Sequence, residues 1–218
     1  MYDNVIVPDD GSLSARDALG PASDFAWRCN ARVVIVNNTE ATDPVARNAL
    51  KMKAKSMSGS DVDYWIDTEH TIAENLLEAS RHRPRSIICI PIREKRGVLL
   101  RKPLLTETSA DVLLGSRVPV MVVGPEVAVS RGLSLSEVVV PLDGSTLSEH
   151  VLPIAAHWAQ TLRMRLSIIG VVPDNGDDHA GERTYLQDAC RRIAEEVTDA
   201  GFELIESSDP VAGIVGFV

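Results

Sequence analysis

The residues with the clearest chemical potential lie in two short acidic turns. Asp10-Gly11-Ser12 follows the apolar segment 5–8, and Asp143-Gly144-Ser145 follows the similar segment 138–141. Glycine allows the chain to turn sharply, serine or aspartate can cap the next helix, and a carboxylate accepts hydrogen bonds from a ligand. Each turn therefore has two open interpretations, a helix cap or part of a ligand site.

A cluster of basic residues offers a second candidate site. Five of the ten positions in 93–102 are basic, namely Arg93, Lys95, Arg96, Arg101 and Lys102. Such side chains can hold a phosphate or another small anion. The same cluster is also typical of a solvated surface loop. Both interpretations stay open from the sequence.

Signatures of catalysis and of metal binding are missing from the sequence. It contains no P-loop, G-x-G-x-x-G, H-E-x-x-H or G-x-S-x-G motif. Cys89 lies among isoleucines, where we expect an inert core thiol. His150 and His157 lie two turns apart on one expected helix, too far apart to chelate one metal alone. We therefore predict no catalytic residue, no metal site and no enzymatic activity.

The two acidic turns belong to an internal repeat with an offset of 133 residues. At this offset Arg32 matches Arg165 and Ile35 matches Ile168, without a gap. Such agreement predicts a tandem duplication. We expect one domain over 1–124, a linker over 125–136 and a second domain over 137–218.

The first domain alternates five strand-like segments with four helix-like segments. The expected strands are 5–7, 32–36, 61–66, 86–90 and 118–123. The expected helices are one through Leu19 and Ala26, one over 43–57, one from a Thr71–Glu74 capping box to His82, and one over 104–114. This alternation predicts an α/β, Rossmann-like, doubly wound parallel sheet of order 3-2-1-4-5. Asp10 would then lie at the carboxyl end of strand one, where such sheets bind ligands.

The second domain repeats only part of this pattern. Its expected strands are 137–141, 166–172 and 202–206, and its expected helices are 146–162, 182–200 and one beginning at Asp209-Pro210. A capping box at Thr146–Glu149 is expected to open the first helix. At the 133 offset Val218 matches Arg85, so strands four and five are expected to be lacking. Truncation or partial observation of the chain, a partner that covers the open edge, and a degenerate copy all remain possible explanations.

Composition and charge exclude several classes of protein. The net charge is −9, which disfavours a general nucleic-acid or membrane-surface binder, and aromatic residues make up only 4%. The three cysteines have no CxxC spacing, the N-terminus is acidic where a signal peptide needs positive charge, and no apolar run is long enough to span a membrane. We expect a cytoplasmic location.

An apolar strand followed by Pro-x-Asp-Gly-Ser and a helix with alanines on its buried face resembles the universal stress protein family. The resemblance implies two Rossmann-like domains related by a pseudo-twofold axis, pairing through fifth strands (118–123 here), and an adenine-nucleotide site in which Asp10 meets the ribose or the base. The family's G-x2-G-x9-G-[ST] motif after strand four would fall near Arg93, Arg96 and Thr106. None of these is glycine, and Gly97 is one position away. We expect a degenerate nucleotide site.

The leading hypothesis is a non-enzymatic stress-response module that dimerises or senses a ligand, without a cofactor. Its partners would be a second copy through the fifth strand, or the other domain in a pseudo-dimer, and a small anionic ligand. The alternative is an ATP-binding protein with weak hydrolysis; a broader ATP-consuming enzyme is disfavoured because its Ser-Gly-Gly loop is missing. The candidate nucleotide-binding residues are Pro8, Asp10, Gly11, Ser12, Asn37, Arg93, Arg96, Gly97, Asp143, Gly144 and Ser145.

Overall fold

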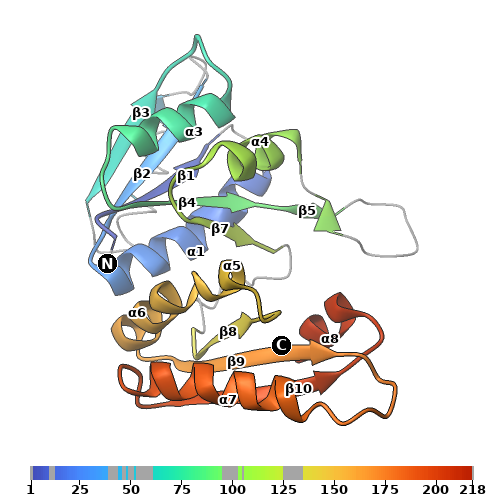
Figure 1. Ribbon diagram of the computed structural model, residues 1–218. Helices are drawn as coiled ribbons and strands as arrows, with labels where there is room; N and C mark the ends of the chain where they lie inside the picture. Colours follow the sequence, from blue (N-terminus) through green and yellow to red (C-terminus); the bar gives the residue numbers. More distant parts are fainter. Residues whose placement is uncertain are drawn as a thin grey trace. The chain divides into compact units, whose positions relative to one another are not determined.

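The chain divides into two compact units, Tyr2–Leu133 and Ser134–Val218 (Figure 1). The computed structural model describes residues 2–9, 13–38, 44–45, 48, 52, 61–94, 103–104, 106–124 and 135–217. Each unit has its own parallel sheet and its own hydrophobic core.

The sheet of the first unit has five parallel strands. They are β1 (Asn4–Pro8), β2 (Arg32–Asn37), β3 (Val62–Ile66), β4 (Ser86–Pro91) and β7 (Val120–Val123). The order is β3-β2-β1-β4-β7, which confirms the predicted order 3-2-1-4-5. All residues of β1 are buried, since an inner strand of a doubly wound sheet is covered on both faces.

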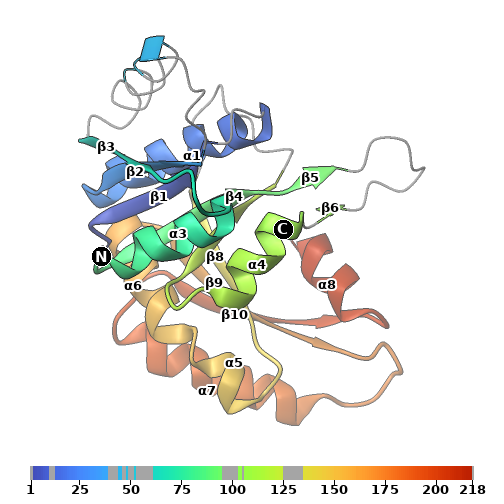
Figure 2. The same cartoon turned by 90° about the horizontal axis from the view of Figure 1, so that it is seen from above.

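Helices cover both faces of this sheet. Helix α1 (Leu13–Cys29) contacts β1 and β4, whereas α3 (Ile72–Arg81) and α4 (Glu107–Gly115) contact each other (Figure 2). Leu76 and Val112 of these two helices join Ile6 and Ile88 in one buried cluster. The predicted capping box at the start of α3 is confirmed by both of its hydrogen bonds. The predicted helix over 43–57 lies largely outside the described residues.

The chain between β4 and α4 contains a short antiparallel pair, β5 (Arg93–Glu94) and β6 (Pro103–Leu104). Helix α4 begins at Glu107, later than the expected 104, because Thr106 is its N-cap. The last strand begins at Val120, later than the expected 118, since Ser116 and Val118 form a hydrogen-bonded turn before it.

The sheet of the second unit has three parallel strands in the order β10-β9-β8. They are β8 (Glu137–Pro141), β9 (Arg165–Val172) and β10 (Ala200–Glu206). The helices are α5 (Thr146–Glu149), α6 (Leu152–Leu162), α7 (Ala180–Ala194) and α8 (Pro210–Phe217). Helices α6 and α7 share one core cluster with Val140, Leu166 and Ile168 of the sheet.

The predicted single helix over 146–162 is wrong, because the segment forms two helices. Ser145 is the N-cap of α5, and its hydroxyl accepts a hydrogen bond from the Ser148 amide, so the expected box at Thr146 does not form. Pro153 lies in the first turn of α6. Proline has no N–H to donate to the carbonyl four residues earlier, which interrupts the helix there.

The two units share their strand register over the first two strands. Asn4 pairs with Arg32 and Glu137 pairs with Arg165, each pair 133 residues from the other. The third strands follow an offset of 138 instead, because the connection before β10 is five residues longer than that before β3. The expected match of Val218 to Arg85 is therefore wrong, and position 218 corresponds to Ser80.

Candidate functional site

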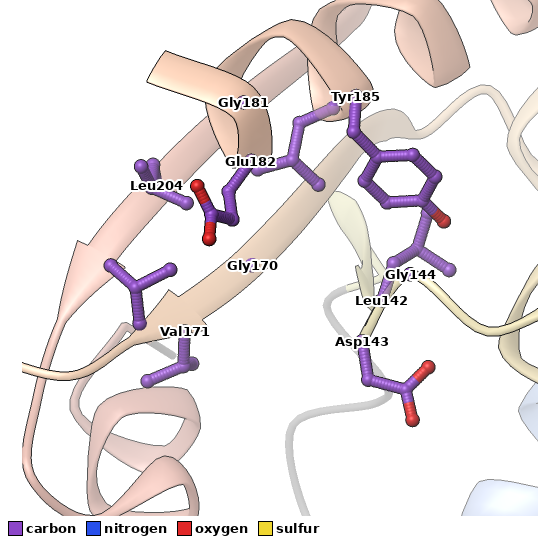
Figure 3. Close-up of a pocket in the computed structure, with 11 residues that line it drawn as sticks. Leu142, Asp143, Gly144, Gly170, Val171, Gly181, Glu182, Tyr185 and Leu204 are labelled. Atoms are coloured by element: carbon purple, nitrogen blue, oxygen red, sulfur yellow. The ribbon is translucent and has the colours of Figure 1, made fainter. Parts of the chain in front are cut away.

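A pocket of about 430 Å³ lies in the second unit, between the carboxyl ends of its strands and α7 (Figure 3). This volume falls within the range of roughly 300–1,000 Å³ that is typical of small-molecule sites. All of its lining residues belong to the second unit. They are Leu142, Asp143, Gly144, Gly170, Val171, Val172, Gly181, Glu182, Tyr185, Leu186 and Leu204.

The pocket owes part of its space to Gly170, near the carboxyl end of β9. A Cβ atom at this position would lie 2.9 Å from Leu186 Cδ1 and 3.4 Å from Leu204 Cδ1. At the matching position of the first unit stands Asn37, whose side chain is buried. The absence of a side chain at residue 170 therefore leaves room between β9 and α7.

The predicted turn Asp143-Gly144-Ser145 caps a helix and contributes to the lining of the pocket. Gly144 has a φ of 83°, in the left-handed region that favours glycine. Ser145 caps α5, and its amide donates to Asp143 Oδ1 over 2.9 Å. Asp143 and Gly144 line the pocket, whereas Ser145 does not. The turn thus starts a helix and places a carboxylate at the pocket.

Two carboxylates are the charged groups of this lining. Asp143 and Glu182 come from different elements and lie on opposite sides of the pocket in the view of Figure 3. Hydrogen bonds from Ser145 and Ser148 lower the pKa of Asp143 to about 2. Asp143 is therefore ionised at neutral pH and can accept hydrogen bonds but not donate a proton.

Tyr185 brings a ring and a hydroxyl group to the same wall, near the first turns of α7. Burial raises the pKa of Tyr185, and the neighbouring Glu149 carboxylate raises it further. Glu149 also forms an ion pair of 3.0 Å with Arg192, which ties α5 to α7. The tyrosine is therefore held as a neutral phenol by its surroundings.

The lining combines apolar side chains with two carboxylates and one phenol. The described residues that line the pocket include no histidine, cysteine, lysine or serine, so they contain no serine or cysteine nucleophile beside a histidine base. Nor do the described parts of the chain contain a group of three side chains able to hold a metal ion. The arrangement can accept hydrogen bonds and bury apolar surface.

The candidate residues of the first unit are arranged differently. Pro8 is buried at the end of β1, opposite Val36. Asn37 is 2% exposed, and its Nδ2 donates to Asp9 Oδ2 over 3.5 Å. Both polar side chains are thus turned toward the interior. Asp10, Gly11 and Ser12 lie outside the described residues.

The structure describes only the two ends of the basic loop, the segment that contains the basic residues of 93–102. Arg93 lies in β5, where it pairs with Leu104, and Arg96 and Gly97 lie outside the described residues. Thr106, near the third expected glycine position, accepts a hydrogen bond from the Ser109 amide as the N-cap of α4. This end of the loop begins a helix with a side-chain cap.

Sequence reasoning missed four residues that the structure brings forward: Asp9, Gly170, Glu182 and Tyr185. Gly170 could have been found, because a glycine inside an apolar strand often marks a close approach or a site. Glu182 and Tyr185 lie in an ordinary amphipathic helix, which carries no comparable signal.

Other groups lie apart from the pocket. Cys89 is fully buried, and burial raises the pKa of its thiol, whereas His150 and His157 are exposed. No helix in the described part of the chain combines the length and the apolar character needed to cross a bilayer.

Comparisons with known proteins identify the fold. No family model and no curated protein matches the sequence. A universal stress protein from Archaeoglobus fulgidus DSM 4304 has a similar structure, with a TM-score of 0.69 and 20% sequence identity. The match covers 100% of this chain and 83% of the length of that protein. A protein of unknown function from Pseudomonas aeruginosa PAO1 is also similar, with a TM-score of 0.64 and 16% sequence identity. That match covers 98% of this chain and 76% of the length of the Pseudomonas protein. The chain has the α/β fold of a universal stress protein.

Proposed function

We propose that this chain is a non-enzymatic, ligand-sensing module of the universal-stress type. The observation that carries the proposal is the pocket at the carboxyl ends of β8 and β9, lined by Asp143 and Gly144. Open α/β sheets bind their ligands beyond the carboxyl ends of the strands. The lining holds hydrogen-bond acceptors but no serine or cysteine nucleophile beside a histidine base, which supports recognition without turnover.

The chemistry of the lining supports a ligand of nucleoside size. Apolar side chains such as Leu142, Val172 and Leu186 suit a flat base, and the two carboxylates accept hydrogen bonds from hydroxyl and amino groups. Asp143 and Glu182 would repel phosphates within the pocket. Adenosine is the probe of choice, because the sequence resemblance implies an adenine-containing ligand.

The test is calorimetric titration of the full chain with adenosine, AMP and ATP, with and without Mg²⁺. We expect affinity to fall in the order adenosine, AMP, ATP, with no phosphate release. Gly170→Ala should weaken adenosine binding at least about tenfold by moving Leu186 into the pocket. Gly216→Ala is the matched control, because an added Cβ meets nothing within 4 Å there.

Two results would overturn this proposal. Failure of adenosine to bind at millimolar concentration would remove the pocket as a nucleoside site. Preference for ATP with release of phosphate would instead support the alternative function, which depends on Asp10 and the basic loop.

We also propose assembly through β7, which lies at the edge of the first sheet and carries a half-exposed Val122. An edge strand presents unpaired backbone groups to a second chain. Light scattering of the full chain should show a dimer that Val122→Lys converts to a monomer. A monomeric wild-type protein would remove this mode of assembly.

A further inference from the structure

The first unit has a cavity of its own beside β3, the strand at one edge of its sheet (Figure 1). The cavity has a volume of about 570 Å³ and is lined by residues of β3, of the loop after β3 and of α3. This volume is large enough for a small molecule. None of the candidate nucleotide-binding residues is among the described residues that line it. The cavity is therefore distinct from the candidate nucleotide sites.

Asn75 of α3 brings a hydrogen-bond acceptor to this cavity. Its side chain is 1% exposed and belongs to the lining. The side-chain Nδ2 donates to the Asp67 carbonyl over 2.7 Å, which fixes the other end of the amide as the oxygen. This oxygen, Oδ1, accepts no hydrogen bond from the described residues. An unpaired acceptor in so buried a side chain is unfavourable, so the site favours a ligand that donates a hydrogen bond.

Three carboxylates line the same cavity, those of Asp67, Glu74 and Glu78. The backbone of Asp67 is bonded to Asn75, and Glu78 follows Asn75 by three residues, a spacing that puts Cβ atoms about 5–6 Å apart on a helix. Backbone hydrogen bonds lower the pKa of Asp67 and of Glu74, and a hydrogen bond from Arg81 lowers the pKa of Glu78. All three are therefore ionised at neutral pH, next to the free amide oxygen.

The positive groups of the lining do not balance these charges. Arg81 bonds Glu78 over 2.8 Å and is the one guanidinium among the described lining residues. His70 lies 3.0 Å from Asp67, and His82 lies 2.9 Å from Glu78. The cavity carries two net negative charges when both histidines are neutral. Each carboxylate can accept further hydrogen bonds beyond those it already receives, so a cation with N–H groups is attracted and can be bound.

One wall of the cavity is aromatic and aliphatic. The ring of Trp65 stacks on His82, with centroids 5.6 Å apart, and the Arg83 guanidinium lies 5.2 Å from the centroid of the same indole. The indole is thus already in contact with one cation. Leu77 adds an aliphatic surface to the lining. Such a wall suits a hydrocarbon chain between two charged ends.

We propose that this cavity binds an aliphatic diamine through its two ammonium groups. One ammonium group donates to Asn75 Oδ1 and to the carboxylates of Asp67 and Glu78. The other is held by Glu74, one turn before Glu78 on α3, while the carbon chain lies against the aromatic and aliphatic wall. A primary ammonium group has three donors and no acceptor, which matches a lining rich in acceptors.

A diamine fits the lining better than a single metal ion does. The described parts of the chain contain no group of three histidine, cysteine or carboxylate side chains placed to hold one metal ion. The carboxylates of the cavity are therefore too widely spread for one small ion, whereas a diamine spans them. Its two charges also equal the net negative charge of the lining.

The test is calorimetric titration of the full chain with putrescine, a four-carbon diamine, at low ionic strength. A pH of about 8 keeps the amine charged and lies above the ordinary pKa of histidine. We expect saturable binding to one site, with NMR shifts of the Asn75 side-chain amide and the Trp65 indole. Butylamine, which has the same chain and one ammonium group, should bind at least about tenfold more weakly.

Two matched variants locate the site. Glu78→Gln should weaken putrescine binding at least about tenfold, because it removes a charge that contacts the ligand. Glu69→Gln removes the same charge from an exposed residue of the neighbouring loop that is not among the described lining residues, so it should change the affinity less than about threefold. Circular dichroism checks that both variants are folded.

Several results would overturn this proposal. They are no saturable binding of putrescine at millimolar concentration, equal affinities for putrescine and butylamine, and equal losses in the two variants. Displacement of putrescine by an equal concentration of Mg²⁺ would show instead that the carboxylates hold a metal ion. The adenosine titration of the second unit is independent of all these outcomes, so the two proposals can fail separately.

Discussion

Asn30 and Arg163 lie 133 residues apart and adopt the same left-handed backbone conformation, with φ of 53° and 55°. Each follows the helix that leads from the first to the second strand of its unit. The amide after Asn30 donates to Ala26 O over 2.8 Å, and the amide after Arg163 donates to Ala159 O over 2.9 Å. The same helix ending is thus built from two different residue types.

Replacing these two residues with glycine should change the free energy of unfolding by different amounts. A left-handed conformation costs a residue such as arginine about 1–2 kcal/mol, whereas asparagine adopts it more readily. Glycine avoids this cost, but it loses more conformational entropy than arginine when the chain folds. The net effect of Arg163→Gly should therefore be a rise of about 0.5–1 kcal/mol in the free energy of unfolding. Asn30→Gly should change it by roughly zero. Urea denaturation measures both, and an equal gain at the two positions would contradict this explanation.

Gly170 predicts a loss of stability as well as of ligand binding. Because an added Cβ would lie 2.9 Å from Leu186, Gly170→Ala should lower the free energy of unfolding of the second unit by about 1–3 kcal/mol. Gly181→Ala, where a Cβ meets nothing within 4 Å in the first turn of α7, should raise it by about 0.5–1 kcal/mol. Amide exchange of β9 reports both changes. Similar effects of the two variants would show that no crowding occurs at Gly170.

Asp143 predicts an acid-dependent contribution to the stability of the second unit. Its pKa is about 2 in the folded chain against an ordinary value of 3.8, so the unfolded chain binds a proton first as the pH falls. The stabilisation is present above about pH 4 and is lost as the pH falls toward about 2. Asp143→Asn should therefore lose less stability than the wild type across this window, and Asp178→Asn should follow the wild type. Parallel curves for all three proteins would contradict this effect.

The capping box of α3 predicts a local loss of helix stability. Thr71 Oγ1 accepts from the Glu74 amide over 3.2 Å, and Glu74 Oε2 accepts from the Thr71 amide over 2.8 Å. Thr71→Ala should lower the free energy of unfolding by about 1 kcal/mol, because it leaves a helix-end amide without its side-chain partner. Thr68→Ala, three residues earlier and exposed, is the matched control. Equal melting temperatures for the two variants would show that the cap contributes nothing.

Much of the sheet could be predicted from the sequence, because its signals are local. Apolar β-branched segments alternate with helix patterns, and this alternation leaves few topologies for a parallel sheet. The Thr71–Glu74 box marked one helix start for the same reason. The break between α5 and α6 was missed although Pro153 was visible, because the strong pattern of apolar residues spans the break.

The pocket could be predicted only in part. The Asp143-Gly144 turn is visible as a motif, so these two lining residues were found. The space beside Gly170 depends on where Leu186 and Leu204 are packed, which is a tertiary property. The offset of 133 was wrong for the third strand for a similar reason. The connection before β10 is longer than that before β3, and the matching residues of the first two strands do not reveal this difference.

The central claim is that the pocket of the second unit binds a nucleoside-sized ligand. Its most direct test is an amide NMR titration of the full chain with adenosine. The account predicts saturable shifts at Asp143, Gly144, Gly170 and Tyr185. In Gly170→Ala the shifts at Asp143, Gly144 and Tyr185 should need at least about ten times more adenosine to reach half-saturation. Saturable shifts confined to residues of the first unit, or no shifts at all, would contradict it.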